Sequence, residues 1–369
     1  MYEDLALFRR YPRLLVYLPW ISLGIWPTPV QRMSKLEKSF NLPAFYVKRD
    51  DVSSDVYGGN KVRKLEFSLA DALCKGCNRV MTVGAAGSNH VLATAVHGRR
   101  LGIGTTALLF DQPCALYVRR NLLMDHVNHV RMVWVPSVPL VPLAWAGETL
   151  RVAFLSPGER LYRLPAGGSS PLGCLGYVNA GLEIAEQVEE GLLPEPDYVV
   201  VAMGTHGTAA GLWLGLKMGG LSSRVVGVAV VEKWLCNPYL WARLANRTAS
   251  LINALDPGAE APRARPSDLI YVEEHLGAGY ASLTSDGVRA VKEVGELEDL
   301  KLEGTYTGKA MAAALDLGRE MDNSGSMLFI NTHNSVDFSS TLQGLDYRVL
   351  PRPFHRFFEQ PCQDEEPGE

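Results

Sequence analysis

The stretch DYVVVAMGTHGTAAGLWLGLKMGG, residues 197–220, decides the fold of this chain. It opens with a short run of β-branched and apolar residues at 198–203, which predicts a buried strand. The glycine turn GTHGT at 204–208 follows, and a mostly apolar helical pattern completes the stretch. A strand that passes through a glycine turn into a helix is typical of βαβ units, whose strands form parallel sheets. We therefore expect an α/β fold.

The same alternation of strand and helix patterns extends over most of the chain. In open parallel sheets, ligands bind at the carboxyl ends of the strands. The polar residues that end the strand patterns, at 84–90, 203–208 and 331–335, are therefore the expected site. The Pro-rich stretch 133–172 is expected to be an irregular excursion or a domain boundary. Strand patterns occupy 45–51, 79–90, 105–110, 130–136, 224–232 and 327–335, and helix patterns occupy 61–77, 89–102, 176–191 and 306–322.

Length and composition favour a globular protein of two domains. The chain has 369 residues, and a domain has ~150 as a soft prior. Apolar residues make up 47% and charged residues 21%, which is enough apolar material for a large core. With 36 basic and 40 acidic residues, the chain has no basic excess to neutralise phosphates. We expect no nucleic-acid partner.

Several features favour the cytoplasm. The N-terminus begins acidic and lacks the order of a signal peptide. The apolar stretches 14–26 and 133–147 contain Pro and are shorter than a membrane span of ~20 residues. Six sparse cysteines do not suggest a disulfide framework, and the lone C-x-x-C pair at Cys74 and Cys77 does not predict a metal site. Residues 351–369 are expected to form a partly disordered tail, because their end is strongly acidic.

The turn Gly204–Thr208 has the features of an anion site. A glycine turn at a helix N-terminus offers backbone N–H groups and the positive end of the helix dipole. The side chains of Thr205, His206 and Thr208 add donors, which suits a phosphate. The alternative is a tight turn with capping threonines. The turn is also a near miss to G-x-G-x-x-G, and Glu232 ends the next strand, so a nicotinamide oxidoreductase is a competing interpretation.

The segment YGGNKVRKLE (57–66) places a lysine at the start of a helix. Asn60 can cap this helix, and Lys61 then lies in its first turn. The positive end of the helix dipole disfavours a cation there and lowers the pKa of Lys61. A lysine with a lowered pKa is what imine formation with an aldehyde requires. Lys64 shares the helix face and competes with Lys61 for this role.

The segment GSNH (87–90) offers donors at the end of another strand. The hydroxyl of Ser88, the amide of Asn89 and the exposed N–H groups suit a substrate carboxylate. Ser88 and His90 also suggest a nucleophile and its base. The alternative is a helix cap followed by a histidine that faces the core.

Four motifs together resemble one known family. GGNKVRKLE, GAAGSNHVLATA, MGTHGTAAG and YTGKAMAAALD match, in order, signatures of the 1-aminocyclopropane-1-carboxylate deaminase/D-cysteine desulfhydrase family. The resemblance covers roughly residues 25–335. It implies a pyridoxal-phosphate enzyme of fold type II, with two open twisted parallel-sheet domains, and a homodimer. We expect residues 1–60 and 176–350 to form the larger domain, and residues 61–175 to form the smaller one.

The resemblance also implies roles for individual residues. Lys61 would hold pyridoxal 5'-phosphate as a Schiff base and move protons. Asn89 would bind the phenolic oxygen of the cofactor, while Ser88 and His90 would face the substrate carboxylate. The phosphate would be held by Gly204, Thr205, His206, Gly207 and Thr208, with help from Lys64. Tyr306 and Tyr280 would line the reaction chamber, and Thr307 and Thr332 would lie near the cofactor.

Two positions indicate the branch of the family. Family deaminases carry Glu in a Y-E-G-K string and a later Leu, whereas this chain has Thr307 and Thr332. A neutral hydroxyl near the pyridine nitrogen makes the cofactor a weaker electron sink, which suits loss of a good β leaving group. We therefore expect α,β-elimination from a small amino acid such as D-cysteine, giving pyruvate, ammonia and sulfide. The alternatives are 1-aminocyclopropane-1-carboxylate deamination and L-cysteate sulfo-lyase activity.

One departure from the family pattern concerns the last strand end. The family usually has T-G-G there, whereas this chain has Thr332-His333-Asn334. Two bulky polar residues replace glycines that let the backbone approach a ligand. The difference is compatible with a local rearrangement, with a changed substrate, or with a non-catalytic protein that binds the cofactor or a metabolite.

Overall fold

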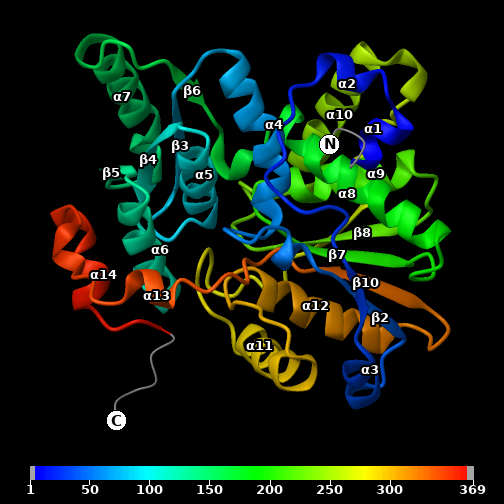
Figure 1. Cartoon of the computed structure of the whole chain (residues 1–369). Helices are drawn as coiled ribbons and strands as arrows, with labels where there is room; N and C mark the ends of the chain where they lie inside the picture. Colours follow the sequence, from blue (N-terminus) through cyan, green and yellow to red (C-terminus); the bar gives the residue numbers. More distant parts are fainter. Residues whose placement is uncertain (1–4, 364–369) are drawn as a thin grey trace. The chain divides into compact units, whose positions relative to one another are not determined.

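The computed structural model describes residues 5–363, which form two compact units (Figure 1). The larger unit comprises residues 5–67 and 169–335, and the smaller unit comprises residues 68–168 and 336–363. Each unit is built on one sheet, with six strands in the larger unit and four in the smaller. The expected α/β class with two parallel-sheet domains is confirmed.

The sheet of the larger unit has the strand order β1-β2-β10-β7-β8-β9. All of its neighbouring pairs are parallel except β1 with β2. β-Branched and apolar residues fill these strands, as expected for a sheet that is buried on both faces. The strands are β1 (Val30–Arg32), β2 (Ala44–Lys48), β7 (Tyr198–Met203), β8 (Arg224–Ala229), β9 (Leu269–Val272) and β10 (Ser326–Ile330).

Helices cover both faces of this sheet, with one hydrophobic core on each (Figure 1). One face is covered by α8 (Pro171–Glu189), α9 (Gly207–Met218) and α10 (Pro238–Leu255), and α1 (Ala6–Arg10) and α2 (Leu14–Tyr17) pack beside them. The other face is covered by α3 (Ser34–Phe40), α11 (Ser285–Glu298) and α12 (Thr307–Glu320). α4 (Asn60–Cys74) starts in the larger unit and continues into the smaller.

The sheet of the smaller unit has the order β5-β4-β3-β6 and is entirely parallel. Its C-terminal segment packs on the same core, where Phe354 and Phe357 lie edge-on against Trp134. The strands are β3 (Arg79–Ala85), β4 (Gly104–Phe110), β5 (Arg131–Val135) and β6 (Leu161–Arg163), and the helices are α5 (Asn89–Arg100), α6 (Leu116–Val127), α7 (Val141–Leu155), α13 (Ser339–Leu342) and α14 (Arg356–Glu359).

The boundaries of the two units differ from the predicted domain limits. Residues 61–67 and 169–175, predicted in the smaller domain, group with the larger unit, and residues 336–350 group with the smaller. The physical reason at the first boundary is Arg63, which is fully buried against side chains of the larger unit. At the second boundary, α8 is one continuous helix from Pro171 that packs along α9.

The Pro-rich stretch is more regular than predicted. It contains part of β5, all of α7 and β6. α7 can include Pro142 because this residue lies in the first turn of the helix, where proline is tolerated. Within residues 5–363, one segment, Val138–Leu155, is long and apolar enough to cross a membrane by length and composition alone, although 133–147 was predicted to be too short. Its mean hydropathy is 1.3 and 11% of it is buried; a single such helix is weak evidence for a span.

The C-terminal segment also differs from the predicted tail. Residues 352–359 form a 3₁₀ turn and α14, and Cys362 forms a disulfide with Cys114. No spacing pattern marks this pair, because 248 positions separate the two cysteines. Residues 364–369, the most acidic part of the predicted tail, lie outside the described residues.

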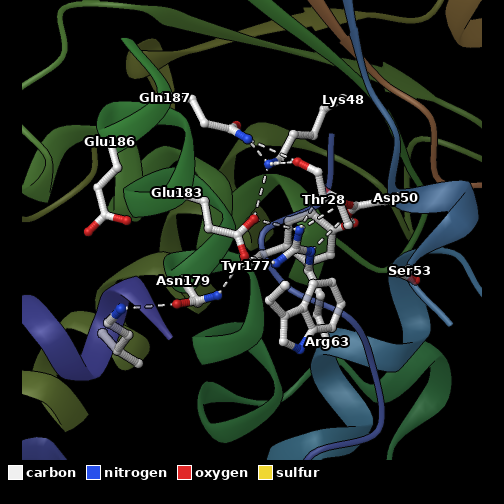
Figure 2. Close-up of polar contacts among 12 residues, drawn as sticks. Thr28, Lys48, Asp50, Ser53, Arg63, Tyr177, Asn179, Glu183, Glu186 and Gln187 are labelled. Atoms are coloured by element: carbon white, nitrogen blue, oxygen red, sulfur yellow. Dashed lines mark hydrogen bonds and ion pairs between the residues drawn. The ribbon is translucent and has the colours of Figure 1, made fainter. Parts of the chain in front are cut away.

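A buried cluster of charges fixes the start of α4 (Figure 2). The guanidinium of Arg63 donates to both carboxylate oxygens of Asp50 (2.8 and 2.9 Å) and of Glu183 (2.8 and 3.0 Å). Lys48 Nζ lies 3.1 Å from Glu183, and Tyr177 donates to Asp50. Burial alone would raise the pKa of Asp50, but the charge of Arg63 and its hydrogen bonds lower it below its usual value. Two cations and two anions therefore compensate one another inside the protein.

Arg63→Met should destabilise the protein by about 3–5 kcal/mol, because it leaves Asp50 and Glu183 buried without their main partner. Urea unfolding followed by circular dichroism measures the change. Arg32→Met, which removes an exposed ion pair with Glu37, is the control and should leave the free energy of unfolding nearly unchanged. Equal losses in the two variants would contradict the role given to the cluster.

Candidate functional site

The glycines before Lys61 let two loops of the larger unit pass closely. A Cβ on Gly59, whose φ is +87°, would lie 2.7 Å from the backbone oxygens of Thr332 and His333. The N–H of Asn60 donates to the Thr332 oxygen (3.3 Å). The two loops lie near the carboxyl edge of the sheet, because the second follows β10, whose neighbour is β7. A larger residue than glycine would separate Lys61 from this edge.

Lys61 and Lys64 form a pair of neighbouring amines on α4. Burial, and then the charge of Lys64, lower the pKa of Lys61 well below its usual value. Burial lowers the pKa of Lys64 to about 8. The sequence predicted a lowered pKa for Lys61 from the helix dipole, but burial is the larger cause. A Lys61 of lowered pKa beside Lys64 combines a nucleophilic amine with a cation for an anionic ligand.

Donor groups converge on the turn that follows β7. A Cβ on Gly207 would lie 2.5 Å from Ser169 Oγ and 2.9 Å from Lys64 Nζ, so only glycine leaves this space open. Ser169 Oγ also lies 2.8 Å from Thr205 Oγ1 and 3.4 Å from Lys64 Nζ. Thr208 Oγ1 accepts from Asn60 Nδ2 (3.0 Å). Hydroxyls, an ammonium and the first turn of α9 thus lie together, and we call this group the anion cup.

Two details of the turn differ from the prediction. His206 lies at φ +65°, and its Nε2 accepts a hydrogen bond from the N–H of Asn237 (3.2 Å). Burial lowers the pKa of His206 to about 4, so its ring is neutral, and the hydrogen bond to its Nε2 ties the turn to the loop before α10. The N–H of Gly207 donates to the Thr205 oxygen (2.8 Å). Asn60 was predicted to cap α4, but it is the first residue of the helix and bonds Thr208.

Tyr280 and Tyr306 meet in the larger unit, although 26 positions separate them. Their hydroxyls lie 2.6 Å apart, and both side chains are half-buried. Burial raises the pKa of Tyr280 to about 12, although the hydrogen bond with Tyr306 opposes this shift. Tyr280 therefore keeps its proton near neutral pH.

Thr307 begins α12 with its side chain turned to the preceding turn. Its Oγ1 accepts from the N–H of Glu303 (2.8 Å) and donates to the oxygen of the same residue (3.2 Å). The Glu303 carboxylate accepts from the N–H groups of Thr305, Tyr306 and Thr307. Glu303 thus serves as the anionic cap of α12, and position 307 itself carries a hydroxyl.

The segment that departs from the family pattern is tied to the lysine loop. Asn334 Oδ1 accepts from the N–H of Gly58 (2.7 Å), and Ser335 Oγ donates to Asp51 (2.8 Å). Asn334 is buried, whereas His333 is half-buried. The replacement of glycine by Asn334 therefore adds a direct link between the end of β10 and the approach to Lys61.

Ser88, Asn89 and His90 lie in the smaller unit, at the junction of β3 and α5. Ser88 is the N-cap of α5, and its Oγ accepts from the Val91 N–H (3.4 Å). The ring of His90 is buried and lies 3.0 Å from Thr82 Oγ1 on β3. These contacts match the cap and the core-facing histidine that the sequence left open as alternatives.

Asn121 on α6 defines how the amide of Asn89 is turned. Asn121 Nδ2 donates to the backbone oxygen of Gly87 (2.9 Å), which can only accept. The same nitrogen donates to Asn89 at 2.8 Å, so the Asn89 atom that faces Asn121 is its oxygen. The Asn89 nitrogen is therefore on the side away from Asn121.

Sequence reasoning missed Ser169 and Asn121. Both are polar residues outside the glycine motifs, and they reach the motifs only through the folding of distant segments. The SS pair at 169–170, directly before a helical pattern, was the available signal for Ser169. Within residues 5–363, no group of three His, Cys, Asp or Glu side chains could hold a metal ion.

Gly207→Ala should weaken the binding of inorganic phosphate at least about tenfold, because its Cβ would fill the anion cup. Isothermal titration calorimetry with phosphate measures this. The matched control is Gly295→Ala, since a Cβ on this α11 glycine meets nothing within 4 Å. If both variants bind phosphate as tightly as the unchanged protein does, the anion cup is not the phosphate site.

Comparisons with known proteins identify the family. The family model described as "Pyridoxal-phosphate dependent enzyme" matches residues 21–333. A D-cysteine desulfhydrase of Klebsiella pneumoniae is 34% identical over 86% of this chain and 94% of its own length. A Pyrococcus abyssi protein named "Putative 1-aminocyclopropane-1-carboxylate deaminase" is 33% identical over 89% of this chain and 93% of its own.

Solved structures agree with the fold. The crystal structure of an ACC deaminase homologue has a TM-score of 0.75 and 30% identity, over 91% of this chain and 98% of the other. A fungal L-serine ammonia-lyase from Rhizomucor miehei has a TM-score of 0.57 and 15% identity, over 85% and 95%, and shows similarity of fold alone. The match over most of its length shows that this chain belongs to the pyridoxal-phosphate-dependent enzymes.

Proposed function

We propose that this pyridoxal-phosphate-dependent enzyme is a lyase that catalyses α,β-elimination from a small amino acid such as D-cysteine. With one water, the products are pyruvate, ammonia and sulfide. The observation that carries the proposal is the placing of Lys61 and Lys64 on one helix face, with Lys64 beside the anion cup. A reactive amine and a phosphate-sized set of donors on one short segment fit a phosphorylated aldehyde.

The anion cup fits the phosphate of the cofactor. Lys64 would supply the positive charge, and the hydroxyls of Ser169, Thr205 and Thr208 would supply hydrogen bonds. Gly204 would let the chain turn out of β7, and the first turn of α9 would add backbone donors. His206 would contribute through its backbone only, because its ring is engaged by Asn237.

The amine of Lys61 would hold the cofactor and then carry the proton of the reaction. When bound, pyridoxal phosphate supplies an electron sink for negative charge at the substrate Cα. Lys61 Nζ would take the Cα proton, because its lowered pKa leaves the amine neutral. The Cβ–S bond of the substrate then breaks, and sulfide leaves.

Tyr280 and Tyr306 are proposed to line the chamber as acid/base groups. Their short contact of 2.6 Å lets one hydroxyl donate while the other relays the proton. Thr307 and Thr332 are proposed to lie near the cofactor. The hydroxyl at position 307, where family deaminases carry a carboxylate, favours elimination of a good leaving group over the opening of a cyclopropane ring.

The roles proposed for Ser88, Asn89 and His90 depend on the family resemblance. Asn89 would donate to the phenolic oxygen of the cofactor through its side-chain nitrogen, because its side-chain oxygen accepts from Asn121. Ser88 and the N–H groups of its turn would bind the substrate carboxylate. His90 would support this turn from within the core through Thr82 rather than touch the substrate.

The alternative within the family is 1-aminocyclopropane-1-carboxylate deaminase, which the names of several relatives support. L-Cysteate sulfo-lyase activity is a second alternative. The nicotinamide hypothesis lacks support, because Glu232, its proposed ribose ligand, accepts from the N–H of Tyr280 (3.1 Å). A non-catalytic metabolite-binding protein would hold the cofactor without turnover.

Assays of the purified protein with bound cofactor should show pyruvate from D-cysteine. D-Serine, L-cysteate and aminocyclopropane carboxylate complete the panel. Lys61→Ala should lower turnover at least about 10³-fold and abolish the yellow absorbance that borohydride removes, while Lys38→Ala, an exposed lysine on α3, should change neither. Formation of 2-oxobutyrate alone would select the deaminase, and amino-acid binding without product would select the binding protein.

The capture of pyridoxal by cofactor-free protein should depend on pH through Lys61. Because only the neutral amine reacts, capture falls as the pH drops below the pKa of Lys61. In Lys64→Met this fall should move to higher pH, because the loss of a nearby positive charge raises the pKa of Lys61. Pyridoxal lacks the phosphate, so the anion cup does not bias the result. Borohydride trapping and mass spectrometry measure the rates; a shift to lower pH would contradict the arrangement.

We further propose a homodimer that acts in the cytoplasm. The dimer is supported by the family resemblance and by exposed apolar side chains of Trp234, Leu235 and Tyr239 at the start of α10. Light scattering should then give twice the chain mass of 40.4 kDa. Cell fractionation tests the location.

A further inference from the structure

Lys309 is a buried cation to which the proposed reaction gives no role. It is the last residue of the YTGK string, lies in the first turn of α12, and is fully buried. Burial lowers its pKa to about 8, against the charges of Glu303 and Glu232. An amine is costly to bury unless polar groups bind it, so its partners indicate what it does.

The partners of Lys309 are backbone oxygens of the loop between β9 and α11. Its Nζ donates to the Leu276 oxygen at 2.7 Å and to the Gly279 oxygen at 3.5 Å. This loop bends sharply, since Gly277, Gly279 and Ala281 have φ angles of +69°, +137° and +59°. Glycine adopts positive φ without strain, whereas the left-handed conformation of Ala281 is unfavourable without support from its surroundings.

Opposite charges hold the two ends of one peptide group in this loop. The C=O of Gly279 faces Lys309, and the N–H of Tyr280, which belongs to the same peptide group, donates to Glu232 Oε1 at 3.1 Å. A Cβ on Gly279 would lie 2.9 Å from that carboxylate oxygen. The plane of this peptide sets the direction in which the Tyr280 side chain leaves the loop.

Lys309 also belongs to the same helix end as the partner of Tyr280. Tyr306 is the N-cap residue of α12, three positions before Lys309, and the Glu303 carboxylate accepts from its N–H (2.7 Å). The start of α12 therefore carries Tyr306 and also, through Lys309, binds the loop that carries Tyr280. The 2.6 Å contact between the two hydroxyls depends on both placements.

We propose that Lys309 is a positioning residue, whose ammonium holds the 276–280 loop so that the Tyr280 hydroxyl meets that of Tyr306. The effect on turnover rests on the proposed function, in which these tyrosines act on the substrate. The effect on the loop does not depend on any activity of the protein.

Hydrogen exchange of the full chain, followed by mass spectrometry, tests the loop directly. In Lys309→Met, exchange of the peptide spanning 274–284 should rise at least about tenfold, while the 204–208 turn keeps its protection. Lys217→Met is the matched control. Lys217 also donates to three backbone oxygens, those of Leu221, Ser222 and Ser223 at 3.0–3.1 Å, but it lies at the end of α9. The Lys217→Met variant should leave the hydrogen exchange of the 274–284 peptide unchanged.

The loaded enzyme gives the second measurement. Lys309→Met should lower kcat at least about tenfold with a smaller change in KM and unchanged cofactor absorbance, and Lys309→Arg should recover part of kcat. If Lys309→Met does not fold, Gly279→Ala disturbs the same peptide and should give the same two effects. Unchanged loop exchange in Lys309→Met, or equal effects in Lys217→Met, would overturn the proposal. Failure of the proposed function would show separately, as absence of turnover in the unchanged protein.

Discussion

The ion pairs of Arg63 are the constraint on which the larger unit depends. Arg63 follows Lys61 by two residues on α4. Its guanidinium binds both Asp50, two residues after the end of β2, and Glu183 in α8. Because the cluster is buried, each charge tolerates burial only while the others remain in place. The first turn of α4 therefore cannot shift without separating these charges. The cluster therefore holds Lys61 and Lys64 in place, although two glycines, Gly58 and Gly59, come just before them.

Another buried carboxylate, on the helix itself, also anchors α4. Glu66 accepts hydrogen bonds from the indoles of Trp20 and Trp26 and from the N–H groups of Leu23 and Gly24. Burial raises its pKa to about 7, although these hydrogen bonds oppose the shift. Trp26 in turn stacks on Arg63, with the guanidinium 4.0 Å from its ring. In the string KVRKLE, Arg63 and Glu66 therefore hold the helix to its surroundings, while Lys64 lies beside the anion cup.

The sequence predicted what is local and missed what depends on long-range folding. The turn after β7 and the start of α4 were found because glycine, hydroxyl and lysine residues cluster within ten positions. α10 and α11 were not predicted, although Asn237 is a typical N-cap residue and caps α10. Ser169 reaches the anion cup, and Cys362 reaches Cys114, only after distant segments fold together. The contact between His206 and Asn237 was not predicted for the same reason, because 31 positions separate the two residues.

Anion binding at Lys64 and imine formation at Lys61 favour opposite protonation states of Lys61. A charged Lys64 favours an anion in the cup and lowers the pKa of Lys61, which keeps that amine neutral and reactive. An anion beside Lys64 offsets its charge and so weakens this effect, which raises the pKa of Lys61. By linkage, a protonated Lys61 must strengthen anion binding by the same free energy. Affinity for a simple anion should therefore rise as the pH falls, whereas reaction with an aldehyde needs the opposite state. A ligand that carries both groups resolves the conflict, since its phosphate binds Lys64 while its aldehyde consumes the neutral amine of Lys61.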